Sequence, residues 1–244
     1  MKKPRRPGSS RPQRSGRPRG GHPNLVNSAR EAAWTALANL NGLESFAPQR
    51  LDQLLRESSL PDVERRLATE LVYGIVRREP VLHLLLQKQI HRPWSQVELE
   101  LRTILLLGGY QLIYADRIPA HAALNTSVDL CARVGRGAAR GFVNGVLRSL
   151  QRSLTEERVR SPSKRALPLD QGEYLVLADD LFPDPLEQGV EYFVEGFGFP
   201  RWLGTRWGER FTTEQLFELG FRLNSPPQMT LRVNRLKMQR GEYL

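Results

Sequence analysis

Cysteine is almost absent from this chain of 244 residues, which contains only Cys131. A single cysteine cannot form a disulfide framework or a cysteine-based metal site within one chain. Because an isolated cysteine in a helix usually packs as a small apolar side chain, we expect Cys131 to be buried and not to act as a nucleophile. The scarcity of cysteine also agrees with a reducing, cytoplasmic setting.

Long apolar runs are missing as well. The longest uncharged apolar stretch, Thr103–Ala115, is shorter than the roughly 18–20 residues that a membrane-spanning helix needs. The N-terminus is basic, but no apolar run follows it, so it does not have the pattern of a secretory signal. The sequence therefore predicts no membrane partner, and Thr103–Ala115 is expected to be a buried core helix.

Acidic residues are absent from residues 1–20, which carry eight of the 36 basic side chains. The rest of the chain has 26 acidic against 28 basic residues, so most of the net charge of +10 lies in this segment. Residues 1–25 are rich in Arg, Pro, Gly and Ser. Such a segment cannot bury enough apolar surface to offset the entropy of ordering, which predicts a basic disordered tail. A basic tail indicates a polyanionic partner.

Residues 26–152 carry apolar stripes at helical spacing, and no segment there alternates with a period of two. This pattern predicts an all-α domain. The first helix is expected to begin at a capping box, Ser28–Glu31. Further helices are expected at Arg50–Glu57, from Pro61, from Pro80, from a second capping box at Ser95 to about Tyr114, from Pro119, and over residues 142–150.

The composition changes after residue 152. Residues 153–197 are interrupted by prolines and enriched in acids, which predicts a linker with a short strand at Tyr174–Leu177. Residues 198–244 predict helices at Pro200–Arg210 and Thr213–Leu223, a break, and a strand at Met229–Val233. Because a strand needs a sheet around it, this segment is interpreted as the incomplete start of a small α+β subdomain.

Three phrases of the helical region carry a family resemblance. They are LVYGIVR at Leu71–Arg77, GYQL with IPAHAA between Gly109 and Ala123, and GFVNGVLR at Gly141–Arg148. Together they resemble the NusB-like domain. That domain is shared by the antitermination factor NusB and by the N-terminal part of the Sun/RsmB-type rRNA cytosine-C5 methyltransferases. The resemblance covers about residues 26–152 and implies an all-α RNA-binding bundle.

The C-terminal segment favours the methyltransferase branch of this family. FPRWL at Phe199–Leu203, NSPP at Asn224–Pro227 and TLRVNR at Thr230–Arg235 are similar to the segment that follows the NusB-like domain in these enzymes. The family's catalytic domain uses a Gly-rich S-adenosylmethionine loop and two cysteines, and neither is present here. Cys131 matches neither catalytic position. No catalytic residue, metal or cofactor is therefore assigned to this chain, although S-adenosylmethionine is implied for the full-length family.

The candidate RNA contacts are basic side chains of the tail and of the helical domain. Contacts of this kind reach phosphates, so they position an RNA without specifying its sequence. The candidates are Lys2, Lys3, Arg5, Arg6, Arg11, Arg14, Arg17, Arg19, Arg77, Arg78, Arg133, Arg136, Arg140, Arg148 and Arg152.

Three functions remain open from the sequence. The first is an RNA-binding protein, directed at ribosomal RNA, that binds without catalysing. The second is the front part of an S-adenosylmethionine-dependent rRNA methyltransferase, truncated or split from its catalytic half. The third is a NusB-type antitermination module that contacts a ribosomal or transcription-complex protein and takes part in regulation of transcription.

Overall fold

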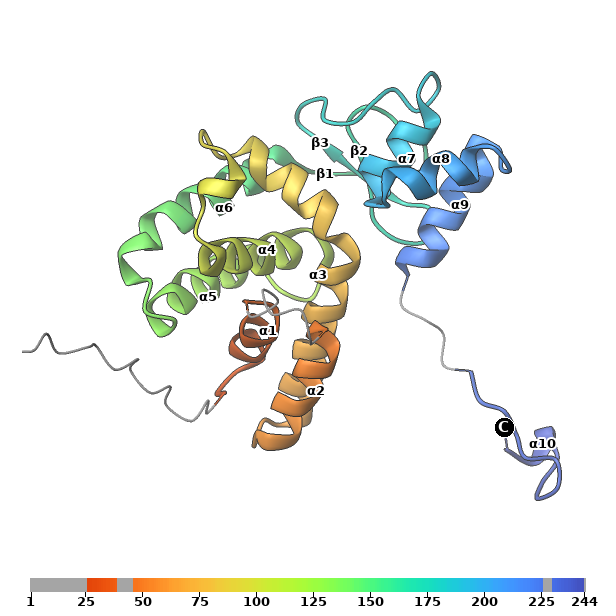
Figure 1. Cartoon of the computed structure of the whole chain (residues 1–244), viewed down its shortest axis with the longest axis horizontal. Coiled ribbons are helices and arrows are strands. Elements are labelled where there is room, and N and C mark those ends of the chain that lie inside the picture. The colour runs from red at the N-terminus through yellow and green to blue at the C-terminus, as the bar shows by residue number, and fades with distance from the viewer. Residues whose placement is uncertain (1–25, 39–45, 226–229, 244) are drawn as a thin grey trace, which may run out of the picture.

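The computed structural model describes residues 26–38, 46–225 and 230–243. The predicted basic tail, residues 1–25, lies outside these ranges. The described chain forms a bundle of six α-helices, α1 to α6, followed by a smaller α+β part that packs beside α3 (Figure 1). In the described ranges no helix combines the length and the apolar character needed to cross a bilayer.

Helix α4 is the centre of the bundle, and its sequence explains why. Eleven of the sixteen residues of α4 (Leu99–Tyr114) are buried, because its apolar side chains point in all directions. The helices α1 (Ala29–Ala38), α3 (Asp62–Lys88), α5 (Ala120–Arg133) and α6 (Arg140–Ser153) pack around it, and α2 (Ala47–Glu57) packs on α1 and α3. The predicted all-α bundle and its buried core helix are confirmed.

Two predicted helix boundaries are wrong. Pro80 does not begin a helix but lies inside α3, which runs without a break from Asp62 to Lys88. Proline leaves the carbonyl of Val76 without its helical donor, but the Val76 side chain is 45% exposed, so this turn lies where water can reach the carbonyl. Ser95 does not cap α4 either, because residues Trp94–Gln96 form a separate 3-10 turn and α4 begins after Glu98.

The predicted linker over residues 153–197 is instead a folded part of the molecule. It contains a three-stranded antiparallel sheet in the order β1-β3-β2, formed by β1 (Leu154–Val159), β2 (Ala166–Pro168) and β3 (Tyr174–Leu177). Of the linker prediction, only the strand at Tyr174–Leu177 is confirmed, and its bounds agree. Pro168, one of the prolines that suggested a linker, ends the edge strand β2, where a missing donor is tolerated.

Helices α7 (Gly189–Phe197), α8 (Arg201–Gly208) and α9 (Thr213–Asn224) complete this part around an aromatic core. Tyr192, Phe193 and Phe197 are fully buried, and the Tyr192 hydroxyl donates to the carbonyl of Ala166. Burial raises the pKa of Tyr192 well above its usual value. The aromatic side chains therefore attach the helices to the sheet.

The end of the chain departs from the sequence prediction. A helix is present at Thr213–Asn224, as expected, and the chain leaves it at Ser225. Of the strand predicted at Met229–Val233, Met229 lies outside the described residues, and residues 230–233 form no strand. Leu231 is 59% exposed, so this segment has no sheet to pack on among the described residues. Helix α10 (Arg240–Tyr243) follows.

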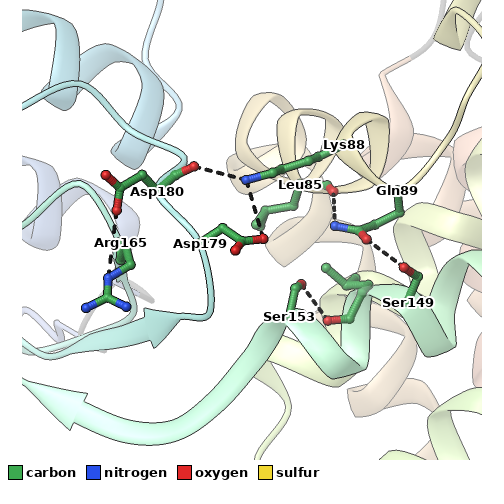
Figure 2. A network of polar contacts seen from close by, with 9 residues as sticks. Leu85, Lys88, Gln89, Ser149, Ser153, Arg165, Asp179 and Asp180 are labelled. Carbon is green, nitrogen blue, oxygen red and sulfur yellow. Dashed lines mark hydrogen bonds and ion pairs between the residues drawn. The ribbon is translucent and has the colours of Figure 1, made fainter.

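The bundle and the α+β part are joined chiefly through α3. Arg78, only 5% exposed, donates to the carbonyls of Pro168 (3.1 Å) and Leu169, and its guanidinium lies 4.7 Å from the ring centre of Tyr114. Figure 2 shows a second attachment, where Lys88 donates to the Asp180 carbonyl (3.0 Å). These contacts fix the sheet to one side of α3.

Replacing Arg78 with leucine should destabilise the protein by about 2–4 kcal/mol, because two buried carbonyls lose their charged donor. Urea denaturation followed by tryptophan fluorescence measures this change. Arg66→Leu, an exposed position on the same helix, is the matched control and should change the free energy of unfolding by about 0.5 kcal/mol or less. Equal effects of the two substitutions would contradict the role assigned to Arg78.

Candidate nucleic-acid interface

Helix α6 presents one apolar face and one basic face. Val143, Val146, Leu147 and Leu150 are buried against the bundle. The helical repeat places Arg148 and Arg152 on the side away from this stripe, and Arg140 and Asn144 at its edge. The phrase GFVNGVLR therefore builds both the core contact of α6 and its exposed surface.

A groove of about 710 Å³ runs along one side of α6, between this helix and the turn that follows α3. Ile90, Phe142 and Val146 supply apolar surface, and Gln89 and Ser149 connect the two walls through a 2.8 Å hydrogen bond, visible in Figure 2. The cationic or ionisable side chains are those of His91, Arg92 and Arg152, and the lining includes no carboxylate among the described residues. We call this space the α3/α6 groove.

The chemistry of the α3/α6 groove suits a nucleic-acid strand. The guanidinium of Arg92 lies 4.7 Å from the ring centre of Phe142, a cation–π geometry that leaves a flat, charged platform. Stacking on aromatic rings and arginine planes is how proteins hold unpaired bases, and nearby arginines hold the phosphates. Gly145 has no atom within 4 Å of the position of a Cβ, so a ligand could approach the helix backbone.

A second, smaller groove of about 430 Å³ lies on the other side of α6. It is lined by Asn125, Asp129, Arg140, Gly141 and Asn144, among others. Arg140 is paired with Asp129 at 3.5 Å, so this side is less basic than the α3/α6 groove. Its amide groups could donate to or accept from base edges.

The structure brings together three of the arginines predicted from the sequence. Arg140, Arg148 and Arg152 all lie on α6 and have exposed side chains. The Nε of Arg148 donates to Asn144 at 3.2 Å and leaves the rest of its guanidinium available.

Arg133 and Arg136, at the end of α5, have acidic neighbours. Arg133 forms an ion pair with Glu31 at 2.6 Å, and Arg136 forms ion pairs with Glu98 at 3.2 Å and Glu100 at 2.8 Å. The hydrogen bond from Arg136 lowers the pKa of Glu100. These arginines therefore do not form one basic surface with α6, and their assignment to RNA remains untested.

Arg77 and Arg78 lie on the side of α3 that faces the sheet. Arg78 is a buried link between the two parts of the chain, and its donors are used by carbonyls of the sheet, so the predicted RNA contact of Arg78 stays a prediction without support from its position. Arg77 is half-buried and lines a cleft beside the sheet. The eight basic tail residues, Lys2 to Arg19, lie outside the described residues.

Sequence reasoning missed His91 and Arg92 and assigned Phe142 only to the core. In the structure Phe142 is only half-buried and packs partly against the core, so one part of its ring lines the groove. The position of Arg92 beside it depends on the packing of the α3–α4 turn against α6, which no local pattern reveals.

Cys131 is buried in α5, as predicted. Its Sγ lies 3.5 Å from the carbonyl of Ser127, and burial raises the pKa of the thiol, which disfavours the reactive thiolate. Over the described ranges, no group of three or more His, Cys, Asp or Glu side chains is placed to hold a metal ion.

The six-helix bundle with its appended α+β part defines a NusB-like protein with a C-terminal extension. Residues 27–152 match the NusB family, and the chain belongs to this family. Residues 199–244 match the ferredoxin-like domain of RsmF/B-type methyltransferases.

Three bacterial proteins illustrate the similarity over most of this chain. The probable ribosomal RNA small subunit methyltransferase B of Synechocystis is 34% identical over 88% of the chain, and that of Bacillus subtilis is 30% identical over 89%. The ribosomal RNA small subunit methyltransferase B of Pseudomonas syringae is 30% identical over 89%. The chain spans only 43%, 43% and 40% of the lengths of these relatives.

Replacing Gly145 with alanine should stabilise the protein by about 0.5–1 kcal/mol, because glycine in a helix costs backbone entropy and the new methyl group meets no neighbour. Chemical denaturation tests this. Gly108→Ala in α4 is the matched control. Its Cβ would lie 2.5 Å from the Leu147 side chain, so this substitution should destabilise the protein by about 1–3 kcal/mol. A destabilised Gly145→Ala protein would show that this face of α6 is covered.

Proposed function

We propose that this protein binds small-subunit ribosomal RNA through the α3/α6 groove, the basic face of α6 and the basic N-terminal segment. The observation that carries the proposal is the Arg92–Phe142 pair in a groove lined by His91 and Arg152 without a carboxylate. The names of the similar proteins support ribosomal RNA as the target class.

The proposed binding mode assigns separate tasks to separate side chains. Arg148 and Arg152 hold phosphates of the strand, while an unpaired base stacks on the platform formed by Arg92 and Phe142. The open backbone at Gly145 lets the strand lie close to α6. Phosphate contacts supply affinity and orientation, and the stacked base restricts binding to regions where the RNA is unpaired.

In this proposal the chain is the substrate-holding part of an rRNA cytosine-C5 methyltransferase that acts in the cytoplasm. S-adenosylmethionine would be the methyl donor of the whole enzyme. We assign no described residue to that cofactor. The bundle holds the RNA while a catalytic domain modifies it. A role in antitermination is less well supported, because residues 199–244 match the methyltransferase-associated domain.

Alanine at Phe142 should weaken binding of an unpaired fragment of small-subunit ribosomal RNA about tenfold, because a base–aromatic stack is lost. Arg148→Ala combined with Arg152→Ala should reduce the dependence of log K on log salt by about 1.4, since about 0.7 is lost for each phosphate contact to a single strand. Fluorescence anisotropy at several salt concentrations measures both effects.

The matched control is Arg133→Ala combined with Arg136→Ala, which removes the same number of charges from arginines that already have acidic partners. This control should keep nearly normal affinity. If it loses as much affinity as the α6 variants, binding reflects net charge alone and the proposed interface is wrong.

Removing residues 1–22 should weaken RNA binding strongly at low salt and little at high salt, because all eight basic residues of the first twenty are lost. If all eight charges paired with phosphates of a single strand, they would contribute about −5 to −6 to the slope of log K against log salt concentration, called here the salt slope. The salt slopes of the full-length and shortened proteins should differ by no more than this amount. Titrations of full-length and shortened protein with the same RNA test this. Identical salt slopes would exclude the tail from the interface.

A further inference from the structure

A cleft of about 560 Å³ lies between the bundle and the α+β part, and both Arg78 and Tyr114 contribute to its lining. Helices α3 and α4 form one wall, through Gly74, Arg77 and Tyr110. Strand β1 and the turn between β2 and β3 form the other, through Arg158 and Gln171. We call this space the junction cleft, and it is separate from the α3/α6 groove.

The floor of the junction cleft is where two of the phrases noted in the sequence meet. A Cβ at Gly74, in LVYGIVR, would lie 2.2 Å from the ring and hydroxyl of Tyr110, in GYQL. Only glycine therefore lets the Tyr110 ring lie across α3. Tyr110 is 8% exposed, and its hydroxyl has no hydrogen-bond partner among the described residues, although it lines the cleft. The Tyr110 hydroxyl therefore faces the cleft, where it can donate to a ligand.

Most charged side chains of the junction cleft have partners. Arg158 pairs with Asp116 at 2.9 Å and with Glu173 at 3.6 Å, and Arg160 pairs with Glu173 at 3.7 Å. Asp170 accepts a hydrogen bond from the hydroxyl of Ser225. These contacts use Asp116, which follows α4, and two carboxylates on the sheet side of the cleft, Asp170 and Glu173.

Arg77 is the exception on the α3 side. It is half-buried and lines the cleft, yet within the described ranges it has no ion pair and no hydrogen bond. Four carboxylates line the cleft, and Glu70, an exposed side chain two turns earlier in α3, is the one for which the described residues supply no ion pair or side-chain hydrogen bond. Tyr73, one turn before Arg77 on the same helix, is 48% exposed.

We propose that the junction cleft binds one phosphodiester group of the RNA, with Arg77 as its principal contact. The guanidinium fork donates to two phosphate oxygens, and the Tyr110 hydroxyl donates a third hydrogen bond from the floor. Tyr73 offers an exposed ring to the base next to that phosphate. The proposal rests on the RNA-binding function proposed above and adds a second, independent contact to it.

The test compares binding of the same ribosomal RNA fragment to the wild-type chain, Arg77→Ala, Arg77→Lys and Tyr110→Phe. Arg77→Ala should weaken binding about tenfold, as expected for a charge-assisted hydrogen bond, and should reduce the salt slope by about 0.7. Arg77→Lys should restore the salt slope but only part of the affinity, because lysine cannot bind a phosphate with a fork. Tyr110→Phe should weaken binding about threefold without changing the slope.

Two further variants separate this effect from general charge and from folding. Arg66→Ala, on the exposed part of the same helix, should bind as the wild type does. Glu70→Gln should bind about twofold more tightly, because an opposing charge at the cleft is removed. Thermal denaturation should be unchanged for Arg77→Ala, since Arg77 makes no polar contact with the described residues.

The outcomes are distinct. If Arg77→Ala and Arg66→Ala bind equally well while the α6 variants lose affinity, the junction cleft is not an RNA site, although the proposed function stands. If the wild-type chain binds no RNA even at low salt, both proposals fail. An Arg77→Ala protein with a lower melting temperature and an unchanged salt slope would also contradict the proposed phosphate site, because Arg77 would then stabilise the fold and not bind RNA.

Discussion

The burial of one guanidinium group, that of Arg78, determines how the two parts of this chain fit together. Arg78 has no carboxylate partner among the described residues. It is held by the carbonyls of Pro168 and Leu169 and by the face of Tyr114. Because a buried charge is costly unless its donors are satisfied, the sheet must keep these carbonyls in place for the fold to be stable. The α3 helix, the end of β2 and the walls of the junction cleft are therefore coupled.

The sequence predicted the bundle well because its helices depend on local periodicity. The apolar stripe of α6 and the uniformly apolar α4 are visible in the chain itself. Of the sheet only β3 was predicted. Strand β2 has three residues, too few to show a convincing alternation, and the six residues of β1 are all exposed or half-buried, so they give no apolar pattern. The aromatic residues that stabilise this part, such as Tyr192 and Phe217, come from helices separated by prolines and acidic residues in the sequence.

The arginines show a different limit of sequence reasoning. Arg77 and Arg78 are adjacent, but successive residues of a helix point about 100° apart, so one is buried in the junction and the other faces a cleft. Arg133 is paired with an acid 102 residues away in the chain, and Arg136 with one 36 residues away. Such pairings depend on tertiary structure, and a count of basic residues along the sequence cannot detect them.

The distance between the two proposed contacts limits how an RNA could use both. Arg77 and Lys88 lie in one unbroken helix, and their separation along its axis is about 16 Å. The α3/α6 groove begins just after Lys88, so a phosphate at Arg77 and a base on Phe142 cannot belong to the same nucleotide. Either several nucleotides of one RNA strand lie along α3 between the two contacts, or the two contacts hold two different strands of a folded RNA. In both cases a rigid α3 favours simultaneous binding, because the second contact forms at a fixed distance from the first.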